Sequence, residues 1–209
     1  MYYYKFWYFR PNKAIAQLIK GKWISRTDKY VSARENYFYG NIPKVLPKNV
    51  ILLGEEPINK VLSKEYKYFL PKDKAIEQIS YLHKVGNIIV RKTKIKVKGL
   101  PNLDLMKEAA KHFIGKKDFT NFTIEREAKN PLCTIIKFDI EERKDYYVFS
   151  IVGDRFLYHM VRKIISFIVS VGYKIYPLEY IDLVFKERLN PKPKDADPKF
   201  LWLWKINKT

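Results

Sequence analysis

Cysteine is almost missing from this chain: Cys133 is the only one among 209 residues. A single cysteine forms no intrachain disulfide, which excludes a small disulfide-stapled scaffold and makes the reducing cytoplasm the expected location. Long apolar runs are missing too. The longest uncharged stretch, residues 164–173, is far shorter than the roughly 18 residues of a membrane-spanning helix. A secretory signal has a basic segment followed by an aliphatic one, whereas residues 1–10 are mainly aromatic, so we expect no secretory signal.

Histidine and glycine are scarce and do not form the patterns of the common cofactor sites. The three histidines, His83, His112 and His159, are far apart and lack metal-ligand spacing, so we expect no metal. The eight glycines form neither GxGxxG nor a phosphate-binding loop followed by Lys-Ser or Lys-Thr. A GxSxG nucleophile motif is also missing. The usual signals of dinucleotide binding, nucleotide hydrolysis and serine hydrolysis are therefore lacking.

Acidic residues are outnumbered by basic ones. The chain has 41 Lys and Arg against 22 Asp and Glu, which gives a formal net charge of +19. Such an excess repels itself in the folded state, so we expect an anionic partner, of which nucleic acid is the commonest. A biased genome or a heat-adapted host could also produce part of this lysine-rich surface. With 47% hydrophobic residues the chain can form a true core, which excludes a disordered tail.

The order of apolar and polar residues predicts strands and helices without regular strand-helix-strand alternation, and hence an α+β fold. The Gly-Leu-Pro-Asn segment at 99–102 is the best internal boundary and divides the chain into residues 1–100 and 101–209. We expect strands at residues 2–9, 23–24, from 31 onward, 50–53, 66–70, 88–97, 134–140, 146–152 and 200–206. We expect helices at residues 14–20, 103–114 with Gly115 as its cap, 156–171 and 178–186.

Three side chains are candidates for chemistry. Asp28 lies in an Arg-Thr-Asp loop, where neighbouring cations keep a carboxylate ionised and able to act as nucleophile or base, although an ordinary turn aspartate fits the same loop. Tyr66 could stack on a nucleobase or simply pack within its strand. Arg162 lies at the margin of the apolar stripe of the helix at 156–171, where a buried guanidinium needs a carboxylate partner. The alternative is that this ion pair is purely structural.

The second half of the chain carries two longer patterns. Residues 113–122 read Phe-Ile-Gly-Lys-Lys-Asp-Phe-Thr-Asn-Phe, and residues 156–165 read Phe-Leu-Tyr-His-Met-Val-Arg-Lys-Ile-Ile. A Val-Gly pair at 171–172 and an apolar strand at 201–204 follow. This half resembles the TruA family of tRNA pseudouridine synthases, whose signatures are G-x-x-D-F-x-x-F and F-x-x-H-M-V-R-x-I.

The resemblance in the first half rests on two short motifs. Residues 26–28, Arg-Thr-Asp, resemble the family's G-R-T-D catalytic loop, and residues 66–68 resemble its Y-x-Y strand. Ser25 and Ser32 stand where the family has glycine and histidine, and the family's Y-D-G segment is missing. Residues 72–98 have no counterpart in the family pattern, and we interpret them as an added RNA-contacting hairpin.

The resemblance implies the pseudouridine synthase fold, with two sheet-plus-helix halves around a basic central cleft. It implies an isomerase that turns uridine into pseudouridine in the anticodon stem-loop of tRNA, around positions 38–40, as a homodimer without cofactor or metal. Asp28 would be the nucleophile or base, Tyr66 would stack on the uracil and help remove the final proton, and Arg162 would pair with Asp28. Arg26 would fill the space of the flipped nucleotide, and His159 would contact the RNA.

Two other interpretations remain open. The first is an RNA-binding or RNA-chaperone protein that keeps the fold without turnover, which the Ser-Arg-Thr-Asp loop and the shortened first half suggest. The second is a structural component of a ribonucleoprotein whose basic face binds phosphates.

Overall fold

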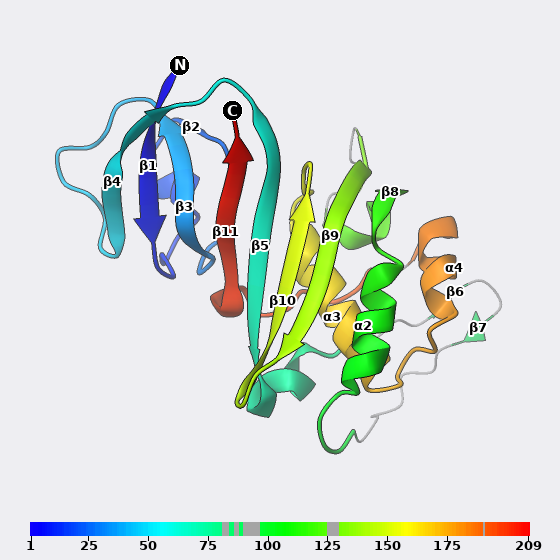
Figure 1. Cartoon of the computed structure of the whole chain (residues 1–209). Coiled ribbons are helices and arrows are strands. Elements are labelled where there is room, and N and C mark those ends of the chain that lie inside the picture. The colour runs from blue at the N-terminus through cyan, green and yellow to red at the C-terminus, as the bar shows by residue number, and fades with distance from the viewer. Residues whose placement is uncertain (81–83, 86–87, 90–96, 125–129, 190) are drawn as a thin grey trace. The chain divides into compact units, whose positions relative to one another are not determined.

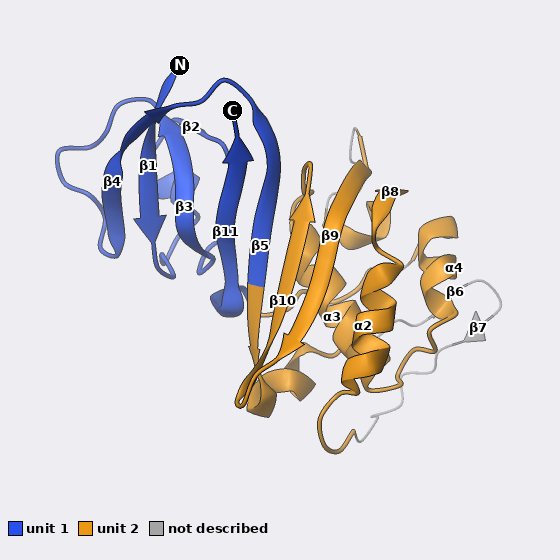
Figure 2. Cartoon of the chain, viewed as in Figure 1, with its two compact units in different colours: residues 1–67, 198–209 blue, residues 68–197 orange. Residues whose placement is uncertain are grey.

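The computed structural model in Figure 1 describes residues 1–209 except 81–83, 86–87, 90–96, 125–129 and 190. The chain forms two compact units (Figure 2). Unit 1 consists of Met1–Lys67 and Pro198–Thr209, and unit 2 consists of Tyr68–Asp197. Both mix strands with helical segments, which confirms the α+β class. None of the helices in the described parts of the chain is long and apolar enough to cross a membrane.

Unit 1 is built on a sheet whose strands run in the order β4-β1-β3-β11-β5 (Figure 1). Neighbours β1 and β3 are antiparallel, with Tyr4 opposite Phe38, whereas β11 lies parallel to β3, with Trp202 opposite Ser32. The short strand β2 pairs with the far end of β3. The bounds are β1 (Tyr2–Tyr8), β2 (Lys22–Trp23), β3 (Ser32–Tyr39), β4 (Val50–Pro57), β5 (Val61–Pro71) and β11 (Leu201–Lys208).

Aromatic side chains form the core of unit 1. The Trp23 ring lies 4.9 Å from that of Phe38 and 5.4 Å from that of Phe6, measured between centroids. The indole Nε1 of Trp23 donates to the carbonyl of Ile19, just after the one-turn helix α1 (Ile15–Leu18). The predicted helix at 14–20 is therefore real but shorter, because the chain turns there to bring Trp23 into the core.

Unit 2 places helices beside an antiparallel sheet. Strand β10 lies between β9 and β5, of which residues 68–71 belong to this unit, and β8 pairs with the other side of β9. The bounds are β8 (Gly115–Asp118), β9 (Leu132–Glu142), β10 (Tyr146–Gly153), α2 (Leu103–Lys111), α3 (Met160–Gly172) and α4 (Tyr180–Lys186). The 3₁₀ turns are η1 (Lys72–Gln78) and η2 (Thr120–Phe122), and η3 (Pro198–Phe200) belongs to unit 1.

Helix α3 is buried along its whole length, as the predicted core helix requires. It begins at Met160 and not at residue 156, because His159 has a left-handed φ of 63° that no helical residue adopts. The prediction for Gly115 was also inaccurate. Helix α2 ends at Lys111, and Gly115, with φ 98°, instead starts strand β8.

The expected strand at residues 88–97 lies largely outside the described residues. Within it the structure has only β7 (Ile88–Ile89), which pairs with β6 (Lys84–Val85). The interpretation of residues 72–98 as an RNA-contacting hairpin stays a prediction.

Candidate active site

The Arg-Thr-Asp loop connects β2 to β3 in unit 1. Ser25 and Thr27 are buried, whereas Arg26 is exposed and Asp28 is partly exposed. The buried residues Ser25 and Thr27 hold the loop in place, and the side chains of Arg26 and Asp28 are left accessible to solvent. The loop therefore displays one cation and one carboxylate from a rigid base.

Asn36 in the middle of β3 holds this loop. Its side-chain Nδ2 donates to the Ser25 carbonyl at 2.7 Å and to the Tyr8 hydroxyl at 2.9 Å, while its Oδ1 accepts from the Ser25 amide at 3.3 Å. The Tyr8 hydroxyl in turn shares a hydrogen bond of 2.7 Å with Thr27 Oγ1. Burial raises the pKa of Tyr8, against the lowering effect of its bonds to Thr27 and Asn36, so this contact is made by a neutral phenol. Both buried loop residues are thereby fixed.

Tyr66 on β5 lies at the same loop. Its hydroxyl shares a hydrogen bond of 2.7 Å with Ser25 Oγ, and Lys64 Nζ donates to the Ile24 carbonyl at 2.7 Å. Burial raises the pKa of Tyr66 to about 12; the Ser25 bond lowers it and the negative charge of Asp28 raises it further. Asp28 and Tyr66 are thus near enough to interact electrostatically, and the Tyr66 hydroxyl keeps its proton at neutral pH.

Arg162 and His159 lie at the start of α3 in unit 2, where both contact the carboxylate of Asp195. Asp195 Oδ2 lies 2.7 Å from His159 Nδ1 and 3.9 Å from Arg162 Nη2, and its Oδ1 lies 3.1 Å from Lys163 Nζ. Arg162 is buried, and its Nε donates to the Ala196 carbonyl at 2.7 Å. The segment around Asp195 is therefore fastened to the first turn of the helix.

The charge of Asp195 is stabilised by these contacts. Partial burial raises the pKa of its carboxyl, but the hydrogen bond and charge of His159 and the contact with Lys163 outweigh burial and bring the pKa to about 2. Asp195 is thus ionised at every pH at which the protein is expected to work.

The predicted site residues are divided between the units. Arg26, Asp28 and Tyr66 lie together in unit 1, and His159 and Arg162 lie together in unit 2. The expected ion pair between Asp28 and Arg162 would join one unit to the other, and it stays a prediction.

Sequence reasoning missed four supporting residues: Tyr8, Thr27, Asn36 and Asp195. Only Asn36 carries a local signal, because asparagine is depleted in strands and here it lies within one, directly before three aromatic residues. Thr27 lies within the Arg-Thr-Asp motif, which does not reveal its buried contact, and Tyr8 and Asp195 have ordinary sequence surroundings. Their roles come from contacts with distant residues.

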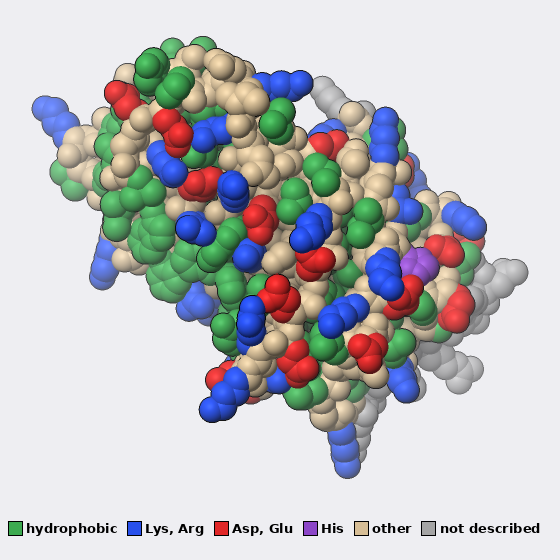
Figure 3. Space-filling view, in the orientation of Figure 1, with side chains coloured by type: hydrophobic (Ala, Val, Ile, Leu, Met, Phe, Trp, Pro, Cys, Tyr) green, Lys and Arg blue, Asp and Glu red, His purple; other side chains and the backbone are tan. Residues whose placement is uncertain are grey.

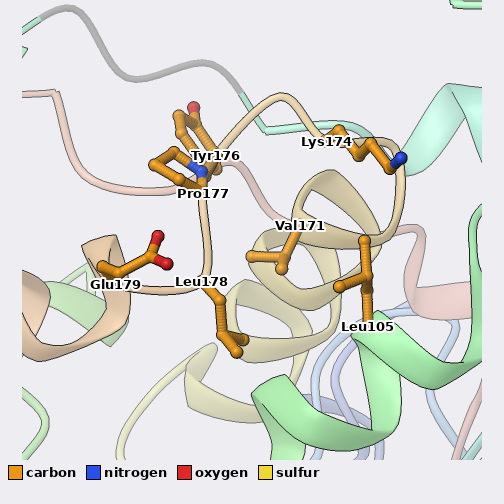
Figure 4. A pocket seen from close by; sticks show the side chains of 7 residues that line it. All are labelled: Leu105, Val171, Lys174, Tyr176, Pro177, Leu178 and Glu179. Atoms are coloured by element: carbon orange, nitrogen blue, oxygen red, sulfur yellow. The ribbon is translucent and has the colours of Figure 1, made fainter.

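Neither metal-ligand groups in the described residues nor the pocket in unit 2 coincides with the predicted site. Across the described ranges, no three His, Cys, Asp or Glu side chains gather as a metal site would require. A pocket in unit 2 lies where α3 ends and the chain turns toward α4 (Figure 4). It offers one ammonium and one carboxylate, Lys174 and Glu179, among mainly apolar side chains, and it contains none of the predicted site residues.

The positive charge is spread over the face of the molecule that is drawn in Figure 3. Figure 3 shows Lys and Arg side chains across the visible face, interspersed with Asp and Glu. Unit 1 is the more one-sided, with sixteen Lys and Arg against five Asp and Glu. The loop that carries Asp28 thus belongs to the unit with the denser positive charge.

Comparison with known proteins finds similarity to one family in the second half of the chain. Residues 109–207, which contain His159, Arg162 and Asp195, match the model of a family described as tRNA pseudouridine synthase. This part of the chain is similar to that family.

Individual relatives extend the similarity. A tRNA pseudouridine synthase A of Methanocella arvoryzae is 35% identical over 102 residues, which are 49% of this chain and 38% of that protein. One of Methanocaldococcus jannaschii is 33% identical over 168 residues, 78% of this chain and 58% of that protein. A tRNA pseudouridine synthase A 1 of Bacillus cereus is 26% identical over 93% of this chain and 86% of its own length. The chain thus spans well under half of the Methanocella protein and most of the Bacillus protein.

Proposed function

We propose that this chain is a tRNA pseudouridine synthase, an isomerase that converts uridine to pseudouridine in the anticodon stem-loop, around positions 38–40. The observation that carries the proposal is the loop of Asp28, which Asn36 clamps and which is hydrogen-bonded to the Tyr66 hydroxyl through Ser25. The match of residues 109–207 to the family model and the names of the relatives support it.

The reaction is a rearrangement within one nucleotide. The bond between N1 of the uracil and C1′ of the ribose breaks, a bond between C5 and C1′ forms, and the proton on C5 is replaced by one on N1. Asp28 starts this sequence as nucleophile or base, for which a partly exposed carboxylate on a rigid loop is suited. Tyr66 stacks on the uracil, and its neutral hydroxyl assists the final proton transfer.

The other predicted residues act on the substrate and on Asp28. Arg26, exposed beside the carboxylate, takes the space of the flipped nucleotide, whose unstacking costs a few kcal/mol. Arg162 pairs with Asp28 and keeps it ionised, and His159 contacts the RNA. The two halves, residues 1–100 and 101–209, enclose a basic cleft for the tRNA; the active form is a cytoplasmic homodimer that uses no cofactor or metal.

One observation favours a second candidate function. The Tyr66 hydroxyl is bonded to Ser25, at the position where the family's loop has a glycine with no side chain to offer. A Tyr66 held in this way stacks less freely on a base, which fits an RNA-binding protein that keeps the fold without turnover.

The experiment compares wild type with Asp28→Ala on an unmodified tRNA transcript with uridines on the 3′ side of the anticodon arm. Wild type should form pseudouridine there, and Asp28→Ala should form none while its tRNA affinity stays within several-fold. Asp139→Ala, which removes an exposed aspartate of unit 2, should keep wild-type activity. Tight binding without product in wild type would favour the non-catalytic candidate, and turnover by Asp28→Ala would refute the role of Asp28.

A further inference from the structure

The chain makes a strained turn immediately after Asp28. The Val31 amide donates to the Asp28 carbonyl at 3.2 Å, which closes a turn over Lys29 and Tyr30. Tyr30 has a φ of 67°, in the left-handed region that a bulky side chain rarely adopts. A residue held there against its preference often marks a functional position.

A second left-handed residue, Arg10, lies against this turn. Arg10 has a φ of 40°. The Tyr30 amide donates to the Pro11 carbonyl at 2.8 Å, and the Arg10 amide donates to Ser32 Oγ at 3.0 Å. Two hydrogen bonds therefore join the segment of Arg10 to the turn of Tyr30. Since that turn is closed on the Asp28 carbonyl, both segments are anchored to the backbone of Asp28.

The side chains of these segments combine cations with aromatic rings. The Arg10 guanidinium lies 4.9 Å from the Phe9 ring, and its Nε donates to the Lys199 carbonyl at 3.0 Å. Lys29 Nζ lies 4.6 Å and Lys199 Nζ 5.8 Å from the Tyr30 ring. Arg10, Lys29 and Lys199 are exposed, and Tyr30 is partly exposed.

The donors of Arg10 are well suited to an anion. Guanidinium has five N–H donors, and the bond to Lys199 uses one of them. Within the described part of the chain, neither Arg10 nor Lys29 forms an ion pair with a carboxylate of this protein. The contact with the Phe9 ring and the bond to Lys199 hold the guanidinium in place, and its remaining donors suit bidentate binding of a phosphate.

We propose that Arg10, Lys29, Tyr30 and Lys199 form a nucleotide subsite beside Asp28, which binds the phosphate and base of a residue flanking the reacting uridine in RNA. Arg10 and the two lysines take the phosphate, and the Tyr30 ring stacks on the base, as aromatic side chains do with unpaired RNA bases. The inference rests on the proposed function for its substrate, and its own observations lie wholly within unit 1.

The test measures the dissociation constant for an unmodified tRNA transcript over a range of KCl concentrations. Arg10→Gln is compared with Arg34→Gln, a matched control whose exposed guanidinium also lies 4.9 Å from an aromatic ring, that of Trp204. We expect Arg10→Gln to weaken binding about tenfold and to reduce the slope of log K against log salt by about one. Arg34→Gln should change neither by more than about twofold. Equal weakening by both variants would mean general charge attraction and would overturn the subsite.

A second variant separates the ring from the fold. Tyr30→Asn keeps the left-handed turn, because asparagine tolerates that conformation, but removes the stacking ring. It should unfold at or above the wild-type temperature and bind tRNA about tenfold more weakly. Wild-type affinity in Tyr30→Asn would contradict the proposal.

Because binding is measured without turnover, the two proposals fail separately. If both variants bind tRNA more weakly but the wild type forms no pseudouridine, the subsite is supported and the proposed reaction is refuted. If the wild type forms pseudouridine and both variants bind tRNA with wild-type affinity, the proposed reaction is supported and the subsite is refuted. Absence of tRNA binding by wild type overturns both.

Discussion

Single buried polar residues decide the geometry of the candidate active site. Asn36 is fully buried, and its amide oxygen and nitrogen both have partners in the Ser25–Thr27 loop or its support. A buried amide costs free energy unless its hydrogen bonds are made, so the side chain and the loop specify each other's position.

Asn36→Ala should therefore damage both stability and chemistry. The substitution leaves the Ser25 amide, the Ser25 carbonyl and the Tyr8 hydroxyl without this partner, which should lower the free energy of unfolding by about 2–3 kcal/mol. Turnover per folded molecule should fall at least about tenfold, because Asp28 loses its fixed position and a displacement of about 1 Å is costly. Urea unfolding and single-turnover pseudouridine formation at saturating tRNA measure the two effects.

The control is Asn121→Ala in unit 2. Asn121 is also buried, and its Nδ2 donates to the carbonyls of Val184 and Glu187, both at 2.6 Å. It should lose a similar amount of stability yet keep wild-type turnover per folded molecule. Equal loss of turnover in both variants would make Asn36 an ordinary stabilising residue.

At the scale of elements, the short connection into β2 depends on a close approach of backbone to ring. A Cβ atom at Gly21 would lie 2.3 Å from Cε2 of Phe38, inside the aromatic core of unit 1. The turn therefore needs glycine for space, since Phe38 is fixed by Trp23 and Phe6.

Gly21→Ala should destabilise the protein by about 2–4 kcal/mol, because Phe38 must move out of a close-packed cluster. Gly54→Ala is the matched control: Gly54 also has a positive φ, 137°, but its Cβ would meet nothing within 4 Å. It should cost about 1 kcal/mol from backbone strain alone. Thermal unfolding of both variants checks the difference, and equal losses would show that the ring contact is unimportant.

The elements differ in how far the sequence predicts them. Apolar periodicity predicted β1, β10 and the core helix α3, because each buries a regular set of side chains. Strand β8 was missed, since Gly-Lys-Lys-Asp has no apolar alternation and becomes a strand only by pairing with β9. The late start of α3 was missed for a similar reason: nothing in the sequence marks His159 as left-handed, and Asp195, 36 residues away, is its partner.

The candidate site was predictable to the same limited extent. Motifs pointed to Asp28, Tyr66 and Arg162, whose residue types suit the proposed chemistry. The clamp of Asn36, Tyr8 and Thr27 was not predictable, because it depends on side-chain contacts across the sheet that periodicity does not specify.

At the scale of the whole molecule, the large positive net charge should make the folded protein sensitive to acid. Protonation of carboxylates adds to an already large positive charge and removes ion pairs that offset it. Asp195 is the most consequential of these groups in unit 2, since its carboxylate faces three basic side chains, His159, Arg162 and Lys163.

Asp195 should therefore contribute to stability in a defined pH window. Its pKa is about 2 in the folded protein, below the usual carboxyl value of 3.8, so its contribution is complete above that usual value and disappears as the pH falls through 2. The shift corresponds to about 2 kcal/mol. Asp195→Asn should be less stable than wild type by about this amount at pH 6, and the gap should close near pH 2. Urea unfolding at a series of pH values measures the gap, and a gap independent of pH would contradict this assignment.

The position of β11 has a consequence for the order in which the molecule folds. Trp202 of β11 is in register with Ser32 of β3, and every residue of unit 2 lies between the two in the chain. During synthesis, β3 and β5 therefore emerge from the ribosome long before the strand that separates them, whereas unit 2 has by then received nearly all of its residues. Pairings so distant along the chain form slowly, because loop closure must come first. The sheet that carries the Asp28 loop can thus be completed only after the last residues of unit 2 have been synthesised.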